Sequence, residues 1–171
     1  MRTEKDWIKR AYAQMNSKYI NIGPYSGYRS GNVDFDRMEL FLKLDSQDNE
    51  LGDALLLAIE NSTFLSLEEA ERLRMDEQSY PNWVKKTMKN QGHKTKGEMF
   101  KPMFSCDVRK ETDGFLFYPT HQRAIMSWEG NEYTKANKFT IPLTATATEM
   151  GAALRRCLAL CTSKFDLPKD S

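Results

Sequence analysis

The sequence predicts an α/β domain of the α+β type, in which helices pack against a mainly antiparallel sheet of about five or six strands. Six short segments are rich in β-branched and aromatic residues and are separated by turn residues. Longer segments repeat apolar residues at helical spacing. In the second half of the chain, three strand-like segments follow one another with short turns, which favours antiparallel pairing.

The N-terminal part of the chain predicts a helix followed by a strand. Apolar residues recur at helical spacing from Trp7 to Met15, so we expect an amphipathic helix within residues 1–17. Residues 18–22 then alternate polar and apolar side chains, which is typical of a half-buried strand.

Residues 23–31 are rich in glycine and tyrosine and predict a loop. Their spaced glycines lack the Lys and Ser/Thr that accompany a phosphate-binding loop, so a surface loop is favoured. Tyr25, Tyr28 and Arg29 are candidate partner contacts, because aromatic and Arg side chains dominate interface hot spots when they are exposed. Packing of these side chains within the loop is the alternative and is slightly favoured.

The rest of the chain alternates between the two periodicities. Strands are predicted at residues 38–44, 104–110, 114–119, 124–130 and 138–143. Helices are predicted at residues 51–62, 67–73, 80–92, 96–103 and 149–163.

Two parts of the chain resemble each other as strand-loop-helix units, near residues 38–65 and 137–164. A displacement of 99 residues superposes five identical pairs: Leu44 and Leu143, Glu50 and Glu149, Gly52 and Gly151, Ala54 and Ala153, Leu55 and Leu154. A glycine inside a helix costs about 1 kcal/mol relative to alanine, so a close packing contact is expected there. We expect both helices to press on one sheet at these glycines.

Length and composition fit one folded domain, residues 1–171. Hydrophobic residues make up 40% and charged residues 29% of the chain, which is ordinary globular composition. The charged N-terminus is unlike a secretion signal, and no stretch approaches the roughly 18 apolar residues of a membrane span. The odd number of cysteines, three, predicts reduced thiols in the cytoplasm.

The formal net charge of +1 hides two segments of opposite sign. Residues 34–79 carry thirteen acidic and four basic side chains, a net charge of −9. Residues 81–110 carry eight basic and two acidic side chains, a net charge of +6. Such segregation favours a charged partner.

Four segments resemble, in order and spacing, a family of contact-dependent growth-inhibition (CDI) immunity proteins. The resemblance runs from about Lys18 to Thr162 and leaves the N-terminal helix outside it. The segments are ELGDALLLAIENSTFL, GHKTKGEMFKPMFSC, YPTHQRAIMSW and IPLTATATEMGAALRRCLALCT.

The resemblance implies a bacterial cytoplasmic protein that binds the C-terminal toxin domain, commonly a nuclease, of a cognate surface-delivered effector. Neutralisation by binding needs no enzymatic activity, cofactor, metal or membrane. Many such proteins are strongly acidic, whereas this chain is nearly neutral, so the acidic segment is expected to supply the charge complementarity. The candidate partner contacts there are Asp45, Asp48, Glu50, Asp53, Glu68, Glu69 and Glu71.

A hydrolase would have to use His93 or His121, with Cys106, Asp107 and Asp113 as partners. No motif connects these residues, and local hydrogen bonding explains both histidines better. Two cysteines lie four residues apart on the last predicted helix, but core packing is favoured over metal binding.

The alternative function is RNA binding by residues 81–110. Lysines that alternate with Trp83 and Phe100 are typical of a surface that neutralises phosphates and stacks bases. Both aromatic residues also fit apolar helix faces, so solvated lysines on a helix are the favoured interpretation. The lysines are Lys85, Lys86, Lys89, Lys94, Lys96 and Lys101.

Overall fold

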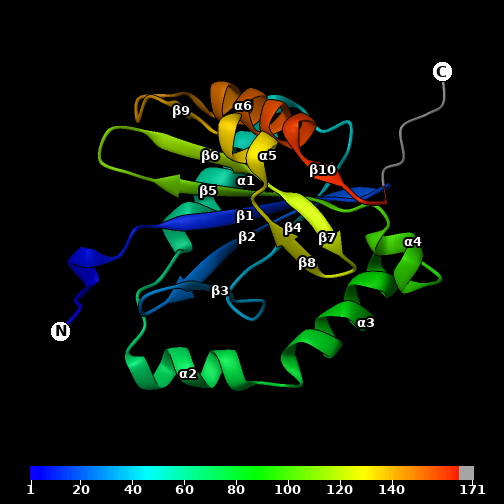
Figure 1. The fold of residues 1–171 in the computed structure, drawn as a ribbon, viewed down its shortest axis with the longest axis horizontal. Helices are drawn as coiled ribbons and strands as arrows, with labels where there is room; N and C mark the ends of the chain where they lie inside the picture. The colour runs from blue at the N-terminus through cyan, green and yellow to red at the C-terminus, as the bar shows by residue number, and fades with distance from the viewer. Residues whose placement is uncertain (166–171) are drawn as a thin grey trace.

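The computed structural model describes residues 1–165 and contains one large and one small sheet. The large sheet has seven strands in the order β3, β2, β1, β5, β6, β9, with β4 also paired to β2 (Figure 1). All its pairings are antiparallel. The strands are β1 Arg10–Met15, β2 Tyr19–Gly27, β3 Gly31–Val33, β4 Leu40–Lys43, β5 Phe104–Lys110, β6 Phe115–Pro119 and β9 Phe139–Ile141.

The small sheet continues from the end of β6. It has the order β10, β7, β8, in which β7 and β8 form an antiparallel hairpin and β10 pairs with β7 in parallel. Its strands are β7 His121–Ala124, β8 Ser127–Glu129 and β10 Thr162–Ser163. The mainly antiparallel sheet expected from the sequence is therefore confirmed.

Helices connect and cover the strands. A single 3-10 turn, Glu4–Asp6, precedes β1. Side-chain caps fix several helix starts: Ser66 accepts a hydrogen bond from the Glu69 N–H (3.2 Å), and Thr95 accepts one from the Glu98 N–H (3.1 Å). The helices are α1 Asp48–Asn61, α2 Leu67–Met75, α3 Ser79–Gln91, α4 Lys96–Phe100, α5 Glu132–Ala136 and α6 Ala147–Leu160.

The predicted N-terminal helix is wrong, because Arg10–Met15 form β1 between β2 and β5. The local pattern was ambiguous, since Ala11, Tyr12 and Ala13 are all fully buried. A strand that is buried on both faces carries a continuous apolar run, which periodicity alone does not separate from a helix. Pairing with two neighbouring strands decides the conformation.

The predicted loop at residues 23–31 is also largely wrong, because β2 continues through Gly23 and Pro24 to Gly27. The first part of β2 pairs with β4 and the last part with β3, so the Gly-Pro pair lies where the partner strand changes. A proline is tolerated at such a gap in the ladder. Gly23 leaves room for the Tyr12 ring, whose hydroxyl oxygen would lie 2.5 Å from a Cβ there.

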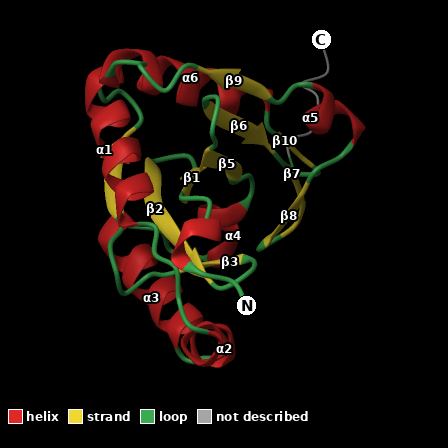
Figure 2. Ribbon diagram, turned by 90° about the vertical axis from the view of Figure 1, so that its left-hand side faces the viewer, coloured by secondary structure: helices red, strands yellow, loops and turns green. Residues whose placement is uncertain are grey.

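The related units place α1 and α6 together on one face of the large sheet (Figure 2). A close contact at both glycines is confirmed, but the predicted partner is wrong, because the helices press on each other rather than each on the sheet. A Cβ at Gly52 would collide with the Ala147 carbonyl oxygen, and one at Gly151 with the Asp48 carbonyl oxygen. Each glycine thus meets the first turn of the other helix.

Two hydrophobic clusters follow from this arrangement. The first joins α1 and α6 to inward-facing residues of the sheet such as Ala13, Val108 and Phe117. The second lies around α3 and α4 and contains Trp83, Val84, Met99, Phe100 and Met103. The second cluster forms one side of a cavity.

Candidate interaction site

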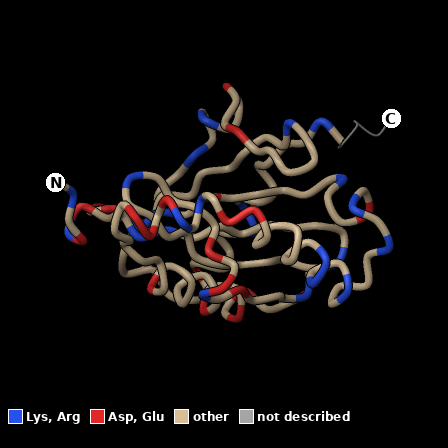
Figure 3. The backbone as a smooth tube through the Cα atoms, turned by 90° about the horizontal axis from the view of Figure 1, so that it is seen from below, with Lys and Arg blue, Asp and Glu red and all other residues tan. Residues whose placement is uncertain are grey.

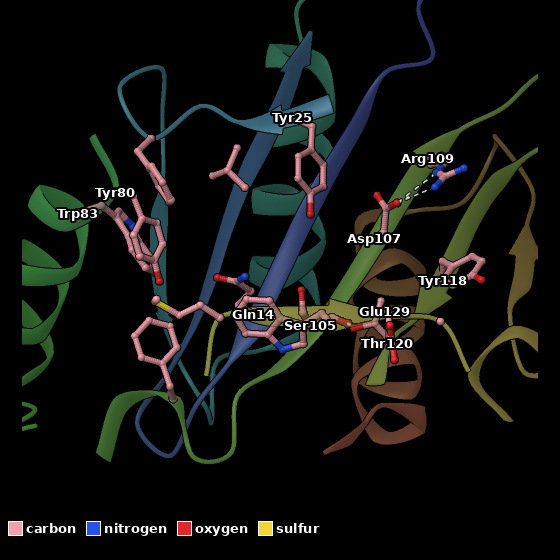
Figure 4. A pocket seen from close by; sticks show the side chains of 16 residues that line it. Gln14, Tyr25, Tyr80, Trp83, Ser105, Asp107, Arg109, Tyr118, Thr120 and Glu129 are labelled. Carbon is pink, nitrogen blue, oxygen red and sulfur yellow. Dashed lines mark hydrogen bonds and ion pairs between the residues drawn. The ribbon is translucent and has the colours of Figure 1, made fainter. Parts of the chain in front are cut away.

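A cavity of about 550 Å³ lies on the sheet face opposite α1 and α6. Strand alternation builds its floor. Cys106 and Val108 of β5 point into the first hydrophobic cluster, so Ser105, Asp107 and Arg109 point into the cavity. Figure 4 shows Tyr80 and Trp83 on one side of the cavity and the Asp107–Arg109 pair on the other.

Aromatic side chains form one wall of the cavity. The Phe35 and Trp83 rings stack with centroids 4.6 Å apart, and the Tyr80 ring lies 5.8 Å from that of Trp83. The Trp83 indole N–H donates a hydrogen bond to Glu39 (2.7 Å), which also accepts one from the Tyr12 hydroxyl. Burial raises the pKa of Glu39, and the hydrogen bonds from Tyr12 and Trp83 oppose that shift.

Polar groups on the cavity surface retain unused hydrogen-bonding capacity. The Arg109 guanidinium donates to Asp107 Oδ2 (2.9 and 3.2 Å), but the buried Oδ1 atom has no partner among residues 1–165. The buried Tyr80 hydroxyl also has none within the described chain, and burial raises the pKa of Tyr80. A bound molecule that supplies partners would remove the free-energy cost of these buried polar atoms.

The β7–β8 hairpin forms the third side of the cavity. The Trp128 indole N–H donates to the Met103 carbonyl oxygen (2.8 Å), which holds β8 to the segment after α4. The Gln122 side chain accepts a hydrogen bond from the Met103 N–H (3.0 Å) and donates one to the Phe100 carbonyl oxygen (2.6 Å). The hairpin is therefore fixed at its base, while Met126 at its tip is exposed.

The acidic candidates near the start of α1 lie away from the cavity. The Asp48 carboxylate accepts a hydrogen bond from Arg155 of α6 (2.7 Å), and Glu50 accepts one from the Gln47 N–H (2.8 Å). Asp45 and Asp53 are exposed. This group forms one acidic end of the helix pair.

The acidic candidates of α2 form a second group. Glu69 accepts the Ser66 N–H (2.8 Å), Glu68 pairs with Arg72 (3.3 Å), and Glu71 is exposed. The first acidic group lies near the start of α1 and this second group follows its end. At 1.5 Å per residue, α1 is about 20 Å long. The structure does not combine the two groups into one acidic face.

The tyrosine candidates divide between two places. Tyr25 lies in β2 and lines the cavity. Tyr28 packs on Phe64 with ring centroids 5.6 Å apart, and together with Arg29 it borders a shallow depression that also contains Glu71. Two predicted groups, the loop tip and α2, thus meet on the surface.

The residues considered for catalysis are not brought together. His93 contacts Gln91 (3.1 Å), and His121 contacts Thr162 (2.8 Å). Cys106 and Asp107 are adjacent in β5 and point to opposite faces of the sheet. The described residues include no group of three or more His, Cys, Asp or Glu side chains that could hold a metal ion.

The lysines of α3 and α4 are all exposed and gather toward one end of the molecule (Figure 3). The aromatic residues between them are not available for base stacking, because Trp83 is 7% and Phe100 0% exposed.

Within residues 1–165, no helix has the length and apolarity needed to cross a membrane.

Most of the cavity lining could not be predicted from the sequence. Ser105, Asp107 and Arg109 carried a usable signal, because they alternate with apolar residues in a strand and therefore give one polar face. The contributions of Trp128 and Glu129 depend on how the β7–β8 hairpin folds back over the sheet, for which the local sequence holds no signal.

A family model described as CDI immunity protein matches residues 9–161. The chain belongs to the CDI immunity protein family. The match includes β1, so the family similarity extends beyond the Lys18 boundary expected from the sequence. Among curated proteins, the chain resembles the immunity protein CdiI-YPIII of Yersinia pseudotuberculosis. The two are 30% identical over 174 residues, covering 91% of this chain and 98% of that protein.

Two solved structures resemble this CDI immunity protein in fold. A protein of unknown function from Neisseria meningitidis matches with a TM-score of 0.84 and 25% identity, covering 94% of this chain and 99% of that chain. A toxin and immunity complex, CdiA-CT/CdiI, from Yersinia pseudotuberculosis matches with a TM-score of 0.81 and 28% identity. That match covers 91% of this chain and 98% of the solved one.

Proposed function

We propose that this CDI immunity protein binds the C-terminal toxin domain of its cognate effector in the cytoplasm and neutralises it as a stoichiometric complex. The similarity to a protein solved with its toxin supports this function. Binding alone accounts for protection, so no turnover or cofactor is needed.

The cavity is the proposed anchor site for the toxin. The observation that carries this proposal is the unpartnered Asp107 Oδ1 atom and Tyr80 hydroxyl beside an aromatic wall. A polypeptide offers hydrogen-bond donors, acceptors and apolar side chains together, and it therefore fits such a surface. Anchors of this kind lower the dissociation rate.

The exposed acidic groups have a separate proposed role. A nuclease toxin carries basic surface for its nucleic-acid substrate, so acidic side chains such as Asp53 and Glu71 would accelerate its association. The two acidic groups lie apart, and therefore each can be tested independently. In this proposal, contacts in the cavity set the dissociation rate of the toxin, and the two acidic groups set its association rate.

Tyr80→Phe tests the cavity. The variant removes a hydroxyl that has no partner among the described residues, so folding should be retained. We expect about tenfold faster dissociation of the purified toxin domain, the scale of one lost hydrogen bond or slightly more. Tyr133→Phe is the matched control, because Tyr133 is 51% exposed on α5 and does not line the cavity. Equal dissociation rates for both variants would exclude Tyr80 as an anchor.

Charge reversal tests the acidic groups. Asp53→Lys and Glu71→Lys should each slow association, and added salt should reduce the difference from the wild type. Unchanged association of both folded variants would remove these two residues from the proposed steering role.

RNA binding is the alternative function, and it rests on the exposed lysines of α3 and α4. It requires affinity for tRNA that falls steeply with salt and is lost when these lysines are neutralised. The burial of Trp83 and Phe100 argues against it. Absence of tRNA binding at low salt would exclude it.

A further inference from the structure

The tip of the β7–β8 hairpin has an unusual backbone. Ala124 pairs with Ser127, which leaves Ile125 and Met126 as a two-residue turn. Met126 has φ of +149°, a value that glycine adopts readily and other residues rarely do. Two-residue hairpin turns usually place Gly, Asn or Asp at such positions. A methionine here therefore opposes the local backbone preference.

Folding does not explain the choice of methionine. Ile125 packs against the second hydrophobic cluster, whereas the Met126 side chain is 44% exposed and borders the cavity. An exposed side chain recovers little burial energy that could offset backbone strain. Residues held by their surroundings in such rarely populated backbone conformations cluster at functional sites.

The surroundings of Met126 indicate what it would contact. Phe35, Trp83 and Phe100 line the same cavity, while Glu129 lies on β8 nearby in the chain. The cavity lining thus combines apolar side chains with a polar neighbour, the arrangement of an interface core and its rim. Methionine suits such a place because its flexible thioether adapts to a partner.

We propose that Met126 is a toxin-contact residue, held over the cavity by its turn, and that it packs against an apolar side chain of the bound toxin. This inference rests on the proposed function. It adds that the end of the cavity next to Met126 binds an apolar side chain, whereas the end next to Asp107 binds a hydrogen-bond donor.

Met126→Gly tests the proposal because it should preserve or raise thermal stability while it lowers the affinity for the toxin. Glycine relieves the positive φ, so the melting temperature should stay the same or rise. Loss of the side chain should weaken binding of the purified toxin domain about tenfold, as at a moderate hot spot. Met126→Leu should keep the affinity within about threefold, because volume-conserving apolar exchanges are tolerated.

The control is Met75→Ala, because Met75 is 70% exposed on α2 and away from the cavity. It should leave toxin affinity unchanged. Wild-type affinity in a folded Met126→Gly variant would overturn the inference and leave the proposed function intact. A lower melting temperature together with weaker binding would assign Met126 a structural role instead. A wild-type protein that does not bind the toxin domain would overturn the proposed function itself.

Discussion

The Trp83 indole N–H donates a hydrogen bond to the Glu39 carboxylate, with the two atoms 2.7 Å apart. Glu39 precedes β4, and its carboxylate also accepts a hydrogen bond from Tyr12 of β1. One side chain thus connects α3 to the large sheet. The aromatic wall of the cavity depends on this connection, because Phe35 stacks on Trp83.

Glu39→Ala should destabilise the protein by about 2 to 4 kcal/mol, because it leaves two buried donors without an acceptor. The free energy of unfolding in urea measures this effect. Glu39→Gln is the control, since the amide retains one acceptor oxygen and the Tyr12 hydroxyl can accept from the amide N–H₂. A loss below about 0.5 kcal/mol in the alanine variant would contradict the connecting role.

The pH dependence of stability should differ between the wild type and Glu39→Gln. Burial raises the pKa of Glu39 above its ordinary 4.5, so the folded state holds this proton more tightly than the unfolded state. This contribution is fully present below about pH 4.5 and is lost as pH rises through the folded pKa. The glutamine variant should therefore gain stability relative to the wild type as the pH rises from 4.5 through the folded pKa of Glu39. If the difference in unfolding free energy between the two proteins did not change with pH, the raised pKa of Glu39 would be ruled out.

Gly52→Ala and Gly151→Ala should each destabilise the protein by about 3 kcal/mol or more, because a Cβ would separate α1 from α6. Helix propensity alone predicts a gain of about 1 kcal/mol. Gly97→Ala in α4 is the control, because its Cβ would lie at ordinary distances of 3.7 and 3.9 Å from its nearest neighbours. Only this control should stabilise the protein in thermal unfolding. Stabilisation by all three substitutions would refute the close helix contact.

The three cysteines should react with a thiol reagent only when the protein unfolds. All are buried free thiols, and burial raises the pKa of Cys106. Cys106 and Cys161 lie close, with their sulfur atoms 3.6 Å apart. A reagent that releases a coloured aromatic thiol on reaction measures this by absorbance. It should detect three reactive thiols in denaturant and should react only slowly in native buffer. Rapid labelling of the folded protein would contradict this burial.

Local sequence patterns correctly predicted the elements that combine one apolar face with one polar face. Residues 104–110 form β5 with the predicted bounds, and its Cys106 and Val108 side chains pack into the first hydrophobic cluster. The two units with Gly52 and Gly151 each form a strand, a loop and a helix of 14 residues. In these places local propensity and tertiary packing favour the same structure.

The wrong predictions share one physical cause. Arg10–Met15 and the Gly23-Pro24 pair adopt their conformations because of strands distant in the sequence, which a local pattern does not contain. The cavity was missed for the same reason, since Tyr80, Asp107 and Trp128 meet only after folding. Charge counts indicated an acidic segment but not its division between α1 and α2.

The two hydrophobic clusters have different structural roles. The cluster beneath α1 and α6 holds the sheet together, and the cluster around Trp83 shapes the cavity from the other side. A substitution in the second cluster can therefore reshape the cavity, the proposed toxin-binding site, without disturbing how the two long helices meet. Such a scaffold can adapt to a new partner while its folding determinants stay constant.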